Sequence, residues 1–231
     1  MQGVEDPPLL QIKRNFQRPV DRDLAALTGL QTGYITDAMG GRGALDYRIK
    51  PLEPLTGTMV GVALTCHCGP GDNLALLGAL HVARPRDILI VATDGFAGTA
   101  VTGDLVMGMA RNRGIAGLVT DGMVRDVAGI ITVGLPVFCA GVTPNSPARN
   151  GPGLVGLPVI VGGVSVASGD IIVADNDGVV VVSQSLIAGV LERLPAIRAS
   201  EAELEAKVKA GLEIPGFLKD VFTSGRILEV P

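Results

Sequence analysis

Apolar and polar positions along the chain form short continuous apolar runs separated by segments with a helical repeat. The apolar runs are rich in Val, Ile, Leu and Ala, and they predict four buried strands at residues 57–68, 87–93, 114–122 and 135–141. Apolar residues spaced three and four positions apart predict helices at residues 20–30, 32–41, 70–83, 104–113 and 125–134. Strands and helices therefore alternate through the middle of the chain, which is typical of a layered α/β domain.

The last third of the chain is richer in strands. Residues 142–158 contain many Pro, Gly and Asn and are expected to form a loop. Two further strand segments are expected at 158–166 and 170–183, and Asn176-Asp177-Gly178 predicts a hairpin turn of the primed type. A long helix is expected from about residue 184 to 210, followed by a short tail. The chain therefore divides into a lead-in, a domain with some antiparallel or mixed sheet, and a C-terminal helix with its tail, at residues 1–20, 21–183 and 184–231.

Composition narrows the class of protein. Of 231 residues, 47% are hydrophobic and 18% charged, which is a globular composition with a core of aliphatic side chains, because aromatics are only 3%. The net charge is −4 and no basic block occurs, which argues against nucleic-acid binding. No apolar run is long enough to span a membrane, and no signal peptide is visible. Three cysteines make no disulfide framework, so we expect a reduced, cytoplasmic protein.

The strongest candidate for chemistry combines two short segments, Gly103-Asp104-Leu105-Val106 and Arg125-Asp126. One helix and one strand separate them, so both segments are expected at the same edge of a sheet. Gly-Asp-Leu-Val opens a helix whose first amides have no intrahelical partners and form a socket for a carboxylate or a developing oxyanion. Arg125 can bind a carboxylate with two hydrogen bonds, and Asp126 offers the hard oxygen that Mg²⁺ prefers. The pattern predicts a site for a small, anionic, oxygen-rich substrate.

A purely structural interpretation competes with this one. Asp126 in a first helical turn is favoured by the helix dipole by roughly 0.3–1 kcal/mol. Asp104 could be a simple cap, and Arg125 could be an ordinary surface residue.

Other motifs give weaker signals. Cys66-His67-Cys68 would point its cysteines to one face of a strand and His67 to the other, so the three cannot converge on a metal. Gly40–Gly43 lacks the spacing of a nucleotide-binding loop and is expected to be a turn. Cys139 has no obvious partner for nucleophilic catalysis.

The segments GDNLALLGAL, ARPRDILIV, GDLVMGMARNRGIAGLVTDGMVRDVAGI and SGDIIVADNDGVVVV occur in the order seen in the RraA-like family. Over residues 25 to 211 the chain resembles this family, and in particular its 4-hydroxy-4-methyl-2-oxoglutarate / 4-carboxy-4-hydroxy-2-oxoadipate aldolases. The resemblance implies a layered β/β/α sandwich of the swivelling-domain type with a long C-terminal helix that packs on a neighbouring subunit. It also implies homotrimers or homohexamers with active sites between subunits.

The resemblance further implies roles for individual residues. The amides of Gly103, Asp104, Leu105 and Val106 would bind substrate. Arg125 would also bind substrate, Arg125 and Asp126 would both take part in catalysis, and Asp126 would hold a divalent metal. An acidic residue of a neighbour's C-terminal helix would approach that metal, and Glu201 matches this position, with Glu203 or Glu205 as alternatives.

We therefore expect a Mg²⁺- or Mn²⁺-dependent aldolase that releases pyruvate from 4-hydroxy-2-oxo di- or tricarboxylic acids, with oxaloacetate decarboxylation as a related activity. No Schiff-base lysine lies in the motif segments, in keeping with metal-dependent chemistry. The alternative is a non-catalytic regulator that binds a ribonuclease or another protein. In the regulators an uncharged residue replaces the acid after the Arg, whereas this chain has Asp126.

Overall fold

The computed structural model describes residues 6–230, so the ends of the predicted lead-in and tail, residues 1–5 and 231, lie outside the described part. Four parallel strands, β3, β4, β6 and β8, form the centre of a nine-stranded sheet. Further strands extend it antiparallel to β3 and β8. The strands have the bounds β1 Leu10–Ile12, β2 Lys50–Pro51, β3 Met59–His67, β4 Asp87–Ala92, β5 Ala100–Thr102, β6 Gly117–Thr120, β7 Met123–Val124, β8 Val137–Cys139, β9 Gly141–Val142, β10 Gly153–Val155, β11 Val159–Val161, β12 Val164–Val166, β13 Ile171–Asp175 and β14 Gly178–Val182.

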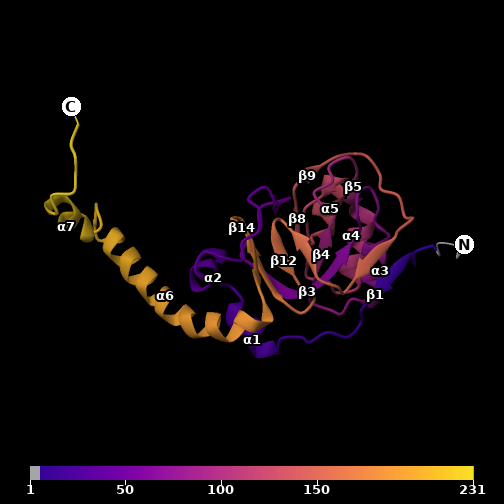
Figure 1. Ribbon diagram of the computed structural model, residues 1–231, viewed down its shortest axis with the longest axis horizontal. Helices are drawn as coiled ribbons and strands as arrows, with labels where there is room; N and C mark the ends of the chain where they lie inside the picture. The colour runs from indigo at the N-terminus through magenta and orange to yellow at the C-terminus, as the bar shows by residue number, and fades with distance from the viewer. Residues whose placement is uncertain (1–5, 231) are drawn as a thin grey trace, which may run out of the picture.

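Helices cover one face of this sheet, and a second layer of strands covers the other (Figure 1). On the helical side, α3 and α4 bury Leu76 and Met107 against Leu64, Leu89 and Leu118 of the sheet. The helices have the bounds α1 Asp21–Leu27, α2 Thr32–Ala38, α3 Leu74–Val82, α4 Asp104–Asn112, α5 Val127–Val133, α6 Ile187–Lys209 and α7 Phe217–Thr223, with a short 3₁₀ turn, η1, at Gln184–Leu186.

On the opposite face, Ile90 of β4 and Phe138 of β8 pack against β11, β12 and one face of the β13–β14 hairpin. The other face of that hairpin packs against α1, α2 and the first turns of α6, through Ile187, Val190 and Leu194. This confirms the expected β/β/α sandwich. The alternation of inward-facing Val and Ile along the hairpin explains how two strands serve two cores at once.

Three short strands form a second sheet that is not hydrogen-bonded to the main one. Its strands β5, β7 and β9 are parallel and only two or three residues long. The sequence did not predict these strands, because residues 100–102 lie in a segment interpreted as a Gly-rich bend. This small sheet matters because the loops that follow its strands meet at one edge.

Several local predictions were wrong in detail. The lead-in contributes β1 to the main sheet, the loop predicted at 142–158 contains β10, and the short tail contains α7. The Asn176-Asp177 turn is not of the primed type, because neither residue has a positive φ. Instead, the Asp175 carboxylate accepts the amide of Asp177. The same carboxylate, 143 residues from Thr32, also accepts the amide and hydroxyl of Thr32 at 2.8 Å, so α2 is capped from a strand end rather than by Thr32 itself.

Helix α6 begins in the domain and then leaves it (Figure 1). Every residue from Arg198 to Lys209 is exposed, although the composition of this region is not purely polar. The exposed apolar side chains of this arm, which we define as residues 198–230, are Leu204, Val208, Leu212, Ile214, Phe217, Val221, Phe222, Ile227, Leu228 and Val230. Among residues 6–230, no helix has the length and apolar composition needed to cross a membrane.

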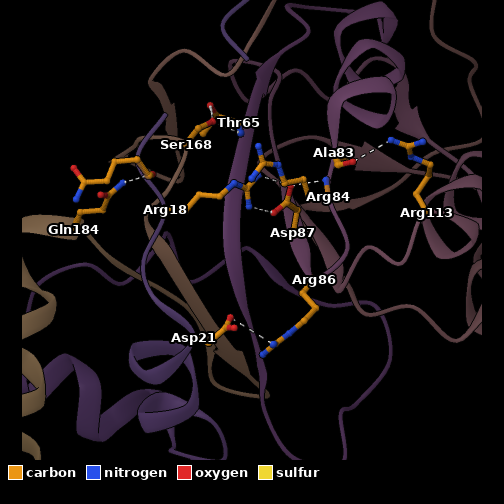
Figure 2. A network of polar contacts seen from close by, with 11 residues as sticks. Arg18, Asp21, Thr65, Ala83, Arg84, Arg86, Asp87, Arg113, Ser168 and Gln184 are labelled. Carbon is orange, nitrogen blue, oxygen red and sulfur yellow. Dashed lines mark hydrogen bonds and ion pairs between the residues drawn. The ribbon is translucent and has the colours of Figure 1, made fainter. Parts of the chain in front are cut away.

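A buried ion pair fastens the N-terminal segment to the main sheet (Figure 2). Arg18 donates from Nη1 and Nη2 to the two oxygens of Asp87, at 2.6 and 3.0 Å, and the amide of Arg84 donates to the same carboxylate at 2.9 Å. The Asp87 side chain is 1% exposed at the start of β4. Three charge-assisted hydrogen bonds therefore compensate its burial.

Replacing Asp87 with Ala should lower the free energy of unfolding by about 1.5–3 kcal/mol, because Arg18 and the Arg84 amide would lose their charged acceptor. Urea unfolding of both proteins measures this change. Asp46→Ala is the control, since its ion pair with Arg48 lies at the surface and its loss should change stability far less. Equal losses in the two variants would contradict a structural role for the buried pair.

Candidate active site at the carboxyl ends of three short parallel strands

The two segments singled out from the sequence lie side by side. Gly103 follows β5 and Arg125 follows β7, and these strands are parallel neighbours. The Arg125 amide donates to the carbonyl of Thr102 at 3.0 Å, which extends the pairing to the point where both segments leave the sheet. The structure therefore confirms that they emerge at one edge, the place where α/β proteins commonly bind ligands.

The Asp126 carboxylate lies directly against the start of α4. A methyl group built on Gly103 would be 2.4 Å from Asp126 Oδ2 and 3.2 Å from Arg125 Nε. The two side chains also form an ion pair, with 3.2 Å between Arg125 Nε and Asp126 Oδ2. They are 36% and 40% exposed, so both can reach a ligand from solvent. Only glycine at position 103 permits this approach.

Asp126 has an unusual backbone conformation. Its φ of 56° and ψ of 46° place it in the left-handed region, where a non-glycine residue is strained by roughly 1–2 kcal/mol. Asp126 is the N-cap of α5, yet its side chain makes no capping hydrogen bond. Asp commonly serves as such a cap. Here the carboxylate is instead turned toward Gly103 and Arg125, and the residue precedes the helix rather than lying in its first turn as predicted.

A matching contact occurs at the start of the other helix. A methyl group on Gly129 of α5 would be 2.5 Å from Asp104 Oδ2, so the Asp104 carboxylate packs on α5 as Asp126 packs on α4. Two glycines thus let the two helix starts approach closely. Each helix start thus receives a side chain from the other.

The 103–106 segment forms the predicted helix start, but its amides are not equivalent. The Leu105 amide donates to Asp104 Oδ1 at 2.7 Å. The amides of Asp104 and Val106 belong to the first turn and have no intrahelical acceptor, so they remain suited to an anion. The Leu105 side chain is 74% exposed at the rim, whereas Gly103 and Val106 are buried.

Ser146 is a contact that the sequence did not suggest. Its hydroxyl accepts a hydrogen bond from Arg125 Nη1 at 2.6 Å. It lies in the loop after β9, the third parallel strand, and the Thr143 amide donates to the Val124 carbonyl at 2.9 Å in continuation of the pairing. The signal that points to Ser146 is its place after β9, because polar residues at the ends of neighbouring parallel strands lie at the same edge.

The structure does not bring Glu201 to the site within one chain. Glu201 is exposed in the part of α6 that leaves the domain. Glu203 and Glu205 form ion pairs with Lys207 and Lys209, whereas Glu201 takes part in none among residues 6–230. Its side chain is therefore available to another molecule.

The Cys66-His67-Cys68 motif is divided as expected. Both cysteines are buried, and the Cys68 thiol together with burial raises the pKa of Cys66 well above its ordinary value. His67 instead contacts the Asp94 carboxylate at 3.0 and 3.1 Å. Across the described residues 6–230, no group of three or more His, Cys, Asp or Glu side chains is arranged to hold a metal.

The volumes of the cavities do not by themselves indicate the position of the candidate active site. A pocket of about 450 Å³ lies between residues 52–60 and α5, and Glu53 is its one charged lining residue. A shallow groove of about 580 Å³ runs instead between α4 and α5, beginning at Asp104 and Leu105. Neither cavity is lined by Arg125 or Asp126, and the groove shares only Asp104 and Leu105 with the segments that form the cluster.

Comparisons with known proteins identify a family and a shared fold. The family model described as RraA-like (Aldolase/RraA) matches residues 32–181. A protein of Halalkalibacterium halodurans, provisionally named a 4-hydroxy-4-methyl-2-oxoglutarate aldolase, is 37% identical over 78% of this chain and 84% of its own length.

Two solved structures have the same fold. An uncharacterised protein from Pseudomonas syringae pv. tomato superposes with a TM-score of 0.75 at 25% identity, covering 85% of this chain and 96% of its own. Streptomyces coelicolor RraAS2, described as an unusual member of the RNase ES inhibitor RraA protein family, gives a TM-score of 0.71 at 28% identity, covering 83% and 100%.

Gly103→Ala should displace the Asp126 carboxylate and lower the free energy of unfolding by about 1–3 kcal/mol, the usual cost of overpacking. The backbone itself would accept alanine, because φ at this position is −145°. Gly108→Ala on the same helix is the control, since a methyl group there meets nothing within 4 Å and should stabilise the helix. Urea unfolding and a crystal structure of each variant measure both effects. Equal stability of the two variants would mean that the contact at Gly103 imposes no constraint.

Proposed function

The chain belongs to the RraA-like family, and on this premise we propose that it is a divalent-metal-dependent aldolase. Its substrates would be 4-hydroxy-2-oxo di- or tricarboxylic acids, which it would cleave to pyruvate and a second 2-oxo acid. Oxaloacetate decarboxylation is proposed as a related activity, because loss of carbon dioxide leaves the same pyruvate enolate.

One observation supports this proposal above the others. The Arg125 guanidinium and the Asp126 carboxylate lie together over the start of α4, at the carboxyl edge of parallel strands, and the backbone of Asp126 is in the left-handed region. This combination offers a positive group, a hard oxygen ligand and amide donors for an anionic substrate.

The donor set fits a divalent ion of the Mg²⁺ or Mn²⁺ type. Such ions commonly take one or two protein carboxylates and retain water molecules in the remaining positions. Asp126 supplies one partly exposed carboxylate, and its Oδ2 is the atom paired with Arg125, which leaves Oδ1 for a cation. When bound, the metal would stabilise negative charge on the substrate oxygens as a Lewis acid.

The residues of the chain would orient the substrate and bind its negatively charged groups. Arg125 would bind substrate oxygens near the reacting carbons, and the amides of Asp104 and Val106 would hold a carboxylate. In the cleavage, the 4-hydroxyl loses its proton, the bond between C3 and C4 breaks, and C3 of the pyruvate enolate gains a proton. Since no histidine lies in the cluster, water is the proposed proton carrier.

We propose that the assembly is a homotrimer or homohexamer in which a neighbour completes the site. The apolar side chains of Leu105 and Met109 are 74% and 52% exposed beside the cluster, and the arm carries further exposed apolar residues. Burying these surfaces against a second copy would remove them from water. Glu201 is the proposed metal-side acid from the neighbour's arm, and its lack of an ion pair among residues 6–230 supports it over Glu203 and Glu205.

A second candidate function is a non-catalytic regulator that binds a ribonuclease or another protein. The similarity to Streptomyces coelicolor RraAS2 supports it. We favour the enzyme because a pure binder has no evident need for a strained carboxylate beside an arginine. We also propose a cytoplasmic location, in keeping with three buried free cysteines.

A panel of 4-hydroxy-2-oxo acids and oxaloacetate should yield pyruvate with added Mg²⁺, and EDTA should abolish the activity. Asp126→Asn should lower turnover by about 100-fold or more, because the main protein ligand of the metal is lost. Asp94→Asn is a matched control, since Asp94 has the same φ of 56° but lies outside the cluster. A coupled pyruvate assay measures all three proteins. Undiminished pyruvate release by Asp126→Asn would exclude this residue as the metal ligand, and capture of a ribonuclease without any pyruvate release would favour the regulator.

Glu201→Gln should lower turnover at least tenfold while leaving the assembly intact. The turnover of Glu203→Gln and Glu205→Gln should stay within about twofold of the parent, because these carboxylates pair with lysines of their own helix. Light scattering checks the assembly, and the pyruvate assay measures turnover. If one of the two control variants loses activity instead, the metal-side acid is that residue, and the assignment of Glu201 is wrong.

A further inference from the structure

We propose that Ser146 is a positioning residue of the active site, whose hydroxyl fixes the direction in which the Arg125 guanidinium faces the substrate. This inference rests on the proposed function, in which Arg125 binds the substrate. It adds the third strand of the small sheet to the site, because Ser146 follows β9 as Gly103 follows β5 and Arg125 follows β7.

Two contacts at different nitrogens define the plane of the guanidinium. Nε of Arg125 pairs with Asp126 Oδ2 at 3.2 Å, and Nη1 donates to Ser146 Oγ at 2.6 Å. A planar group held at two nitrogens cannot rotate freely about its last torsion angles. Arginine has five N–H donors, and the hydrogen bond to Ser146 uses one of them, so the group keeps donors for a substrate anion.

The loop that carries Ser146 is fastened on both sides of it. Before Ser146, the Ala100 amide donates to the Asn145 carbonyl at 2.9 Å, and Asn145 Nδ2 donates to the Gly98 carbonyl at 3.0 Å. These bonds tie Asn145 to the segment that leads into β5. Pro147 follows Ser146 directly and restricts the backbone of the serine to extended conformations.

The other side of the loop is tied to the start of α3. The Ala148 amide donates to the Gly71 carbonyl at 2.7 Å, and the Asn73 amide donates to the Ala148 carbonyl at 3.0 Å. The buried Asp72 carboxylate accepts the amides of Leu74, Asn150 and Gly151. A surface serine on a mobile loop would make a chance contact, whereas Ser146 is presented from a loop held at both ends.

The chemistry of a hydroxyl suits this role. A second carboxylate at this position would neutralise the guanidinium and weaken its attraction for a substrate anion, whereas a neutral acceptor orients the group and leaves its charge intact. Loss of the hydroxyl should therefore release the guanidinium from its orientation without altering the net charge of the site.

The first test measures the guanidinium directly and requires no activity. The full chain and its Ser146→Ala, Ser146→Thr and Asn150→Ala variants are treated with phenylglyoxal, and peptide mass spectrometry gives the modification rate of Arg125. The rate should rise several-fold in Ser146→Ala and stay at the parent value in Ser146→Thr, which keeps the hydroxyl, and in Asn150→Ala, the control in the same loop. Arg149 is the internal reference. An unchanged rate at Arg125 in Ser146→Ala overturns the proposal.

The second test measures the consequence for the reaction. With the 2-oxo acid that the parent protein cleaves, Ser146→Ala should lower kcat/KM about tenfold, the scale of a lost hydrogen bond to a charged group, with an unchanged Tm. Ser146→Thr should restore most of it, and Asn150→Ala should match the parent. A faster modification of Arg125 with an unchanged kcat/KM would overturn the role in the reaction. If the parent releases no pyruvate from any acid, the proposed function fails, and the modification rates alone decide whether Ser146 orients Arg125.

Discussion

The close approach of two helix starts is the constraint on which the site depends. Gly103 at the start of α4 leaves room for the Asp126 carboxylate, and Gly129 in α5 leaves room for the Asp104 carboxylate. A methyl group at either position would lie within 2.5 Å of a carboxylate oxygen. The carboxylate at the start of each helix therefore packs against a glycine of the other helix. These two contacts determine where the charges of Arg125 and Asp126 lie.

The small parallel sheet holds the starts of α4 and α5 close together. Strands of two or three residues have little stability of their own, but β5 and β7 are anchored by Val101 and Val124, which are buried in the same core as Met107 of α4 and Ile130 of α5. The main sheet beneath supports that core through Leu89 and Leu118. The packing of these apolar side chains thus determines where the polar side chains of Arg125 and Asp126 lie.

The sequence predicts the larger part of this arrangement because long apolar runs and helix-start residues are local signals. The central strands, α3, α4 and the adjacency of Gly103 to Arg125 followed from such signals. The strands β5, β7 and β9 could not be predicted, since two or three residues carry no measurable periodicity. The left-handed conformation of Asp126 and the contact of Ser146 with Arg125 depend on neighbours far along the chain. Likewise, the cap of α2 comes from Asp175, 143 residues away along the chain, and no local pattern indicates it.

The energetics of the Arg125–Asp126 pair argue that stability is not the reason for its geometry. A pair with side chains 36% and 40% exposed contributes little to folding, on the order of 0–1 kcal/mol. The left-handed backbone of Asp126 costs about as much or more, and the residue forgoes the capping hydrogen bond that its carboxylate could make to α5. The left-handed conformation of Asp126 is locally unfavourable, and the ion pair adds little to the free energy of folding. The conformation therefore persists because the surrounding core imposes it. This geometry is consistent with the proposed role of Asp126 as a ligand to a cation, beside the Arg125 guanidinium that Ser146 contacts.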